Sequence, residues 1–207
     1  MMNKLGLFGG TFDPIHQGHL HIARAFADEL QLDTVIFLPA GDPYHKNTLQ
    51  TSAHHRIAMI ERAIADDSRF AVSDCDVVRQ GATYTFDTIQ IFRQQFPNTQ
   101  LYWLLGMDSL LQLHTWKRWQ TLVQQTHIAV AARPNESLAQ APRELHAWLG
   151  QALQNGSLHL LQAPLHPISS SEVRRQLKQQ HHVDEHLLPR QVLQYIKQHH
   201  LYQEQQV

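Results

Sequence analysis

Short apolar runs alternate with amphipathic stretches along most of the chain. The runs lie at 5–8, 34–38, 70–72, 101–105, 127–131 and 158–161, and are rich in leucine, β-branched and aromatic residues. Runs of this length and composition predict β-strands. Between them apolar residues recur at helical spacing, as at Leu20, Ala23, Phe26 and Leu30. Alternating strands and helices indicate an α/β protein with a doubly wound parallel sheet and right-handed crossovers.

The carboxyl-terminal part of the chain reads as helical. One helix is predicted from near Ser170 and another from Pro189, because proline is favoured in the first helical turn. We therefore expect a single domain over residues 1–207, with C-terminal helices at about 169–203 packed on it. Residues 135–156 show the weakest pattern, and we expect a surface insertion there.

The composition excludes several classes of protein. A formal net charge of -1 over 207 residues provides no basic field for nucleic acid. The single cysteine, Cys75, allows no internal disulfide, and no apolar run reaches the length of a membrane span. We expect a cytoplasmic protein with no nucleic-acid or membrane partner. Of the 16 histidines, six form the adjacent pairs His54-His55, His181-His182 and His199-His200 in polar stretches, which predicts solvated surface for these pairs. No metal-ligand spacing appears, so we expect no metal site in the protein itself.

The strongest single signal lies between the first predicted strand and the first predicted helix. It reads GGTFDPIHQGH over residues 9–19. Glycines let main-chain amides approach a phosphate, and a helix N-terminus carries a partial positive charge. His16 and His19 are three residues apart at this turn, so both imidazoles can face one anion. The alternative is a plain turn with capping histidines, which the combination of two glycines and two histidines disfavours.

This segment resembles the TxxHxGH signature of the nucleotidyltransferase superfamily, which is related to the HxGH motif of class I aminoacyl-tRNA synthetases. Further matches follow in order: PAGDPYHK at 39–46, Arg56, TYTFDT at 83–88, GMD at 106–108, Trp116 and Trp119 in a WxxW pattern, Arg133-Pro134, and ISSSEVR at 168–174. Together they resemble the bacterial nicotinate-nucleotide adenylyltransferases, from about Lys4 to Tyr202. Two positions depart from that family's pattern. Lys117 stands where an aromatic residue is common, and Tyr44 replaces a proline.

The resemblance implies a Rossmann-like nucleotidyltransferase fold and a site for two anionic substrates. The residues it implies for catalysis are His16, His19, Lys46 and Arg174. The ATP-binding set comprises Gly9, Gly10, Thr11, Phe12, His16, His19, Gly106, Asp108, Ile168, Ser169 and Arg174. The set for the second substrate comprises His45, Lys46, Tyr84, Thr85, Trp116 and Arg133. For Lys46, Arg174 and Trp116, the alternatives are a solvated lysine, an ordinary helix-face charge and a core tryptophan.

The chemistry of adenylyl transfer suits these residue types. An acceptor phosphate is already ionised near neutral pH, so the enzyme has to position two polyanions and neutralise charge, without a strong base. The expected reaction transfers AMP from ATP to nicotinate mononucleotide, giving nicotinate adenine dinucleotide and pyrophosphate in NAD biosynthesis. Mg²⁺ is expected to arrive with ATP. Nicotinamide mononucleotide or phosphopantetheine as acceptor, and a catalytically silent nucleotide sensor, stay open as alternatives. A tRNA-ligating enzyme is disfavoured by the short chain.

Overall fold

One six-stranded parallel sheet forms the centre of the protein. The computed structural model describes residues 3–41, 51–79, 82–132, 137–164, 166–179, 183–184 and 186–203. The strands are β1 (Lys4–Gly10), β2 (Thr34–Pro39), β3 (Phe70–Val72), β4 (Gln100–Gly106), β5 (His127–Ala131) and β6 (Leu158–Leu160). Their order is β3-β2-β1-β4-β5-β6, and every neighbouring pair is parallel. The predicted doubly wound sheet is thus confirmed.

Helices cover both faces of this sheet. They are α1 (Gln17–Leu30), α2 (Ala53–Ile64), α3 (Cys75–Val78), α4 (Thr85–Gln95), α5 (Met107–Leu111), α6 (Trp119–Gln125), α7 (Arg143–Asn155), α8 (Ser170–Lys178) and α9 (Arg190–Gln198), with 3₁₀ turns at Leu113–Thr115 and Leu138–Gln140. One apolar core joins the sheet to α1, α2 and α9, and a second joins it to α4, α6 and α7. None of the helices in the described part combines the length and hydrophobicity that a membrane crossing requires.

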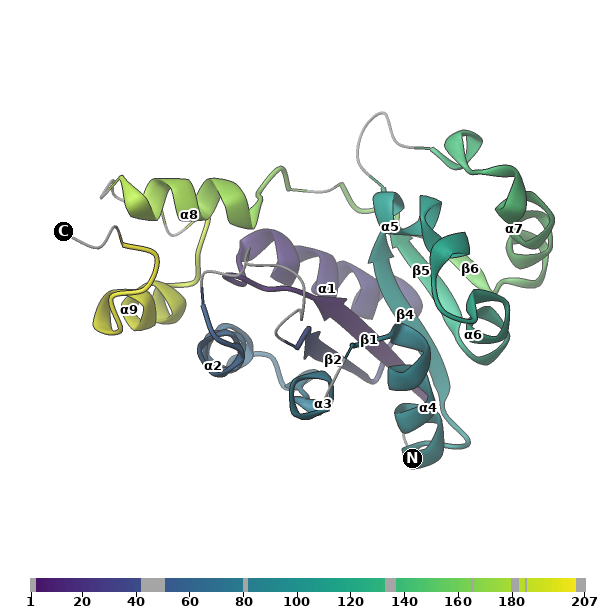
Figure 1. Ribbon diagram of the computed structural model, residues 1–207, viewed down its shortest axis with the longest axis horizontal. Helices are drawn as coiled ribbons and strands as arrows, with labels where there is room; N and C mark the ends of the chain where they lie inside the picture. Colours follow the sequence, from purple (N-terminus) through teal and green to yellow (C-terminus); the bar gives the residue numbers. More distant parts are fainter. Residues whose placement is uncertain are drawn as a thin grey trace.

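The C-terminal helices α8 and α9 lie at the end of the molecule opposite α7 (Figure 1). Val173 of α8 and Val192 and Ile196 of α9 are buried in the core that also contains α1 and α2. Helix α9 packs against α2 in particular. Helix α9 is therefore attached, through α2, to the part of the sheet that contains β2 and β3.

The expectation of a surface insertion over residues 135–156 is wrong for 143–155. This stretch forms α7, whose Leu145, Leu149 and Ala152 are buried against the sheet. The three residues follow the i, i+4, i+7 spacing of one helix face. Other apolar residues of α7 lie off this stripe: Trp148 is only partly buried against the core and Leu153 is exposed, so the helical pattern in the sequence is weak.

The histidine pairs are only partly solvated. His54, His199 and His200 are exposed as expected, but His55 is partly buried between α2 and α9. Its Nδ1 lies 2.9 Å from the hydroxyl of Tyr195. The pair at 181–182 lies outside the described residues.

The strand order reverses between β1 and β4. In open parallel sheets the carboxyl ends of the two strands at such a reversal diverge and leave a crevice where ligands bind. Here those ends are Gly9-Gly10 and Gly106; α1 begins at Gln17, and α5 begins directly after Gly106. The glycine-histidine motif and the GMD segment are thereby placed across one crevice.

Candidate active site

The connection between β1 and α1 (residues 11–16, called the phosphate turn below) ends at His16, whose ring stacks on that of His19 in the first turn of α1. His16 is the N-cap residue of α1, with extended backbone (φ -144°, ψ 171°). Its main-chain N–H donates to Nδ1 of His19 over 3.2 Å, and the two ring centroids lie 3.7 Å apart at 25°. Because Nδ1 of His19 accepts a hydrogen bond, the neutral ring carries its proton on Nε2. That Nε2–H can donate to a bound ligand.

Both imidazoles are neutral near pH 7. Burial lowers the pKa of His16 from 6.5 to about 4. The pKa of His19 is held well below 6.5, first by burial and then by the neighbouring His16. Desolvation penalises the charged form of a group, which is why a histidine in this setting loses its proton. The phosphate turn therefore offers directed N–H donors, and formal positive charge must come from other side chains.

The glycine within the HxGH motif has a steric reason. A Cβ added at Gly18 would lie 3.1 Å from both Cε1 and Nδ1 of His16, and 3.4 Å from Cβ of Ile168. A side chain there would push the His16 ring away from its place over the helix start. Gly18 thus permits the stacked arrangement of the two histidines.

A buried arginine fixes the start of the phosphate turn. Arg56 of α2 is 0% exposed, and its Nη1 donates to the carbonyl oxygens of Thr11 (2.9 Å) and Ala40 (2.8 Å). It ties the segment after β1 to the segment after β2. The family resemblance drew attention to this arginine without giving it a role, and its burial could not be foreseen from a helix pattern alone.

The start of α8 fixes the other half of the turn. Ser169 caps α8, accepting from the main-chain N–H of Glu172 at 3.2 Å. Ser170 Oγ then donates to the carbonyl of Pro14 (3.0 Å), and Arg174 Nη1 to that of Asp13 (2.6 Å). The ISSSEVR segment thereby meets the glycine-histidine motif from more than 150 residues away in sequence.

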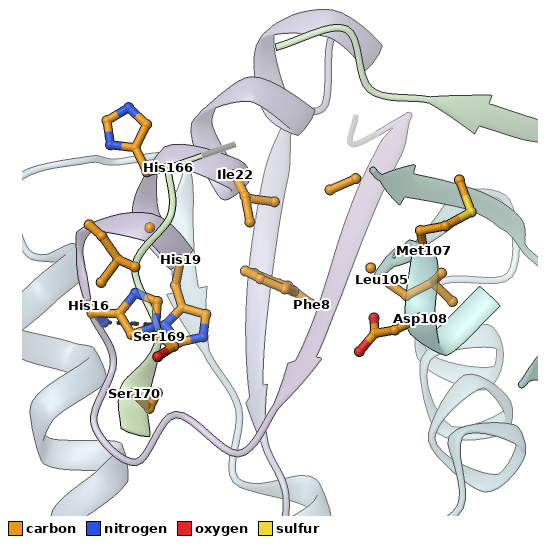
Figure 2. Close-up of a pocket in the computed structure, with 14 residues that line it drawn as sticks. Phe8, His16, His19, Ile22, Leu105, Met107, Asp108, His166, Ser169 and Ser170 are labelled. Atoms are coloured by element: carbon orange, nitrogen blue, oxygen red, sulfur yellow. Dashed lines mark hydrogen bonds between the residues drawn. The ribbon is translucent and has the colours of Figure 1, made fainter. Parts of the chain in front are cut away.

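A pocket of about 240 Å³ opens beside the two histidines. Figure 2 shows His16 and His19 on one wall, Met107 and Asp108 on the opposite wall, and the ring of Phe8 between them. The remaining lining residues are Gly18, Ile22, Leu105, Gly106, Ala131, His166, Ile168, Ser169 and Ser170. Imidazole donors thus face an acidic wall, an arrangement suited to a nucleotide that presents phosphates to one side and hydroxyls to the other.

A second pocket, of about 310 Å³, adjoins the first and shares Phe8, Leu105 and Gly106 with it. Gly9, Gly10, Thr85 and Trp116 are among the residues that line it. A third hollow, of about 270 Å³, is lined by residues 83–86 and 115–117, so Thr85 and Trp116 border both. Two substrates, one in each of the adjoining pockets, could therefore meet at the carboxyl ends of β1 and β4.

A helix begins beside the second and third pockets. Thr85 opens α4, and its N-cap Tyr84 provides no side-chain cap. First-turn amides without a capping side chain are available to an anion. Lys117, the departure from the family pattern, bonds Asp87 at 2.9 Å, and its Nζ lies 4.6 Å from the centre of the Tyr84 ring. It thereby joins the tryptophan segment to the start of α4.

The structure brings together many of the predicted site residues. The first pocket is lined by His16, His19, Gly106, Asp108, Ile168 and Ser169, and the second or third by Gly9, Gly10, Tyr84, Thr85 and Trp116. Three predicted ATP-binding residues line none of these pockets: Thr11, Phe12 and Arg174. The ring of Phe12 is buried against Phe8 and Phe37. His45, Lys46 and Arg133 lie outside the described residues, and their roles stay predictions.

Sequence reasoning missed several lining residues. Phe8 and Leu105 end apolar strands, and strand ends at a crevice are the signal that could have indicated them. Met107 lies within the GMD segment. His166 precedes the ISSSEVR segment, and no local pattern marks it. Among the described residues, no cluster of three or more His, Cys, Asp or Glu side chains could hold a metal ion.

The fold and the site together define a nucleotidyltransferase. Residues 7–176 match the family model described as cytidylyltransferase-like. A protein of Neisseria meningitidis serogroup C, named "Probable nicotinate-nucleotide adenylyltransferase", is 64% identical over 202 residues, covering 98% of this chain and 100% of its own length. A protein of the same name from Bordetella petrii is 41% identical over 203 residues, covering 97% and 100%. The chain belongs to the nicotinate-nucleotide adenylyltransferase family.

Solved structures agree with this fold. The structure of a Plasmodium falciparum nicotinic acid mononucleotide adenylyltransferase, complexed with NaAD, superimposes with a TM-score of 0.74 at 20% identity and covers 97% of each chain. The same protein complexed with APC gives a TM-score of 0.72. At this level of identity the likeness concerns the architecture alone.

Proposed function

We propose that this protein transfers AMP from ATP to nicotinate mononucleotide, forming nicotinate adenine dinucleotide and pyrophosphate. The observation that carries the proposal is the pair of pockets that share Phe8, Leu105 and Gly106 at the reversal of strand order. One pocket has the two imidazole donors and suits ATP. The other has the open start of α4 and Trp116 and suits a pyridine nucleotide. The names of the relatives support the same pair of substrates.

The reaction proceeds by direct in-line displacement. A phosphate oxygen of the acceptor attacks the α-phosphorus of ATP while the bond from that phosphorus to the pyrophosphate oxygen breaks. His16 and His19 are assigned to the α-phosphate, where charge develops in the transition state. Arg174, adjacent to the phosphate turn through Asp13, and Lys46 are assigned to phosphate oxygens. No covalent intermediate on the protein is needed.

Mg²⁺ is assigned to ATP rather than to a cage of protein ligands. The first pocket has one carboxylate, that of Asp108, among its lining residues. One carboxylate together with substrate phosphates and water is a common environment for Mg²⁺. The ion would neutralise phosphate charge, and Asp108 could contact it or the ribose hydroxyls. We also propose that residues 1–207 act as a single domain, and that the reaction takes place in the cytoplasm, where ATP is available.

The start of α4 accounts for a preference for the acid over the amide. Main-chain amides at Thr85 and Phe86 offer donors and no acceptor, so they suit both oxygens of a carboxylate. A carboxamide would present its NH₂ to donors and leave polar groups unpaired. Sites that rely on such hydrogen bonds can discriminate by about 10⁴. Stacking on Trp116 would favour both rings alike.

The test is an acceptor panel. The purified protein is incubated with MgATP and nicotinate mononucleotide, nicotinamide mononucleotide or phosphopantetheine, and pyrophosphate release and the dinucleotide product are measured. We expect the highest kcat/KM for nicotinate mononucleotide. Equal use of acid and amide would refute the acceptor assignment, and the absence of pyrophosphate release with every acceptor would refute adenylyl transfer and favour a nucleotide sensor.

A further inference from the structure

Three side chains from distant parts of the chain meet in a buried cluster beside the phosphate turn. The hydroxyl of Tyr202 donates to Oδ1 of Asp13 over 2.5 Å, and Oγ1 of Thr51 donates to the same oxygen over 2.6 Å. The two hydroxyl oxygens lie 3.2 Å apart. Asp13, Thr51 and Tyr202 are 2%, 7% and 5% exposed. Hydrogen bonds to a carboxylate in such a setting are shorter and stronger than neutral ones.

The end of the chain is held firmly where Tyr202 stands. Tyr202 follows α9, whose Val192 and Ile196 are buried. Its backbone adopts φ 63°, a left-handed conformation that is unfavourable for a residue with a Cβ. The surrounding contacts therefore impose this conformation. Burial, followed by the neighbouring Asp13, raises the pKa of the Tyr202 phenol well above 10, so the hydroxyl keeps its proton and stays a donor.

The cluster is connected directly to the histidines. Asp13 precedes His16 by three residues, and the same residue's carbonyl accepts the bond from Arg174. Tyr202 thus holds the side chain of Asp13, while Arg174 of α8 holds its main chain. A shift of Asp13 would be transmitted along Pro14 and Ile15 to the N-cap residue of α1, where His16 and His19 stack.

We propose that Tyr202 is a positioning residue for adenylyl transfer. By fixing the carboxylate of Asp13, its hydroxyl sets the position of His16 and His19 relative to the α-phosphate, without touching either substrate. The inference rests on the proposed function. It gives the C-terminal turn a part in the reaction that neither the glycine-histidine motif nor the pocket lining contains.

Tyr202→Phe removes only the hydroxyl and tests this directly. Misplacing reacting groups by a fraction of an ångström to an ångström lowers turnover by up to about 10²-fold, so we expect kcat to fall by about 10- to 10²-fold. The KM for ATP should change by less than about twofold, because the contacts that hold ATP equally in the ground state and in the transition state are untouched. Thr51→Val, which removes the second donor to the same oxygen, should change kcat in the same direction.

Tyr195→Phe is the matched control. Tyr195 is also buried, lies on α9, and loses one hydroxyl contact, that with Nδ1 of His55. Within the described residues its hydroxyl bonds His55 of α2 rather than the phosphate turn, so kcat should stay at the wild-type value even where the melting temperature falls. Nitrogen-15 NMR of the imidazoles gives a readout independent of activity: the His16 and His19 resonances should move in Tyr202→Phe and stay in place in Tyr195→Phe.

The outcomes separate this inference from the proposed function. Wild-type kcat in Tyr202→Phe, or an equal fall in both tyrosine variants, would overturn the positioning role. If the wild type transfers AMP to no acceptor, the proposed function fails, and the NMR comparison alone decides whether Tyr202 controls the histidines. Unmoved resonances in Tyr202→Phe would then refute it.

Discussion

The buried imidazole of His16 makes the stability of the protein depend on pH. Burial lowers its pKa to about 4 in the folded chain, whereas an unfolded chain has the ordinary histidine value of about 6.5. Between these values the unfolded chain binds a proton that the folded chain does not. His16 therefore leaves the free energy of unfolding unchanged above about pH 6.5, and reduces it as the pH falls towards about 4.

The size of this effect follows from the gap between the two pKa values. At about 1.4 kcal/mol per pH unit, the whole gap corresponds to on the order of 3 kcal/mol, of which about 2 kcal/mol is lost between pH 7.5 and pH 5. His16 is 5% exposed, so solvent screens little of it. This is a large fraction of the stability of an ordinary domain.

Urea unfolding of the wild type and of His16→Gln at both pH values measures the effect. Glutamine has a similar volume and does not titrate, while all other titratable groups are shared. We expect the wild type to lose about 2 kcal/mol more than His16→Gln on going to pH 5. His186→Gln, at an exposed position, controls for the loss of one imidazole. Parallel pH dependence of the wild type and His16→Gln would refute the reasoning.

Three further predictions concern the site. His19→Ala should lower kcat by about 10²–10³-fold with a smaller change in ATP affinity, measured by steady-state kinetics and calorimetry, and near wild-type turnover would contradict its assignment. Arg56→Met should lower the free energy of urea unfolding by about 2–6 kcal/mol, because the carbonyls of Thr11 and Ala40 lose a charged donor; a loss below about 1 kcal/mol would show that water replaces it. Trp116→Ala should reduce kcat/KM for nicotinate and nicotinamide mononucleotide by the same factor, and a change in their ratio would show that Trp116 selects the acceptor.

Local patterns predicted the sheet well because its strands are short, apolar and clearly bounded. The strand at 127–131 has the predicted bounds, and the strand at 70–72 likewise. The helix α7 was missed because only three buried residues define its inner face. The order of strands cannot be obtained from such patterns, since it depends on which crossovers pass over which face.

The site likewise has a part that sequence patterns could reveal and a part that they could not. His16 and His19 could be found because the whole turn is contiguous in sequence. The side chains that support this turn could not be recognised as its support, because Arg56, Arg174 and Tyr202 lie 45, 161 and 189 residues away in sequence from the residues they bond. Each of these side chains looks ordinary in its own helix or turn. Only the folded chain shows that all three converge on residues 11–13.

Because the two histidines are neutral, they act on the phosphates in a different way from the positively charged side chains. A fixed positive charge binds phosphate in the ground state and the transition state alike, and such uniform binding does not raise kcat. Neutral N–H donors aimed at one position favour the state in which charge gathers there. The stabilisation that such donors give depends on where they point, so the main chain that carries them has to be held in place. The hydrogen bonds of Arg56, Ser170 and Arg174 supply this support to the main chain of the phosphate turn. Burial thus serves two ends at once, since it keeps the imidazoles uncharged and holds them in place.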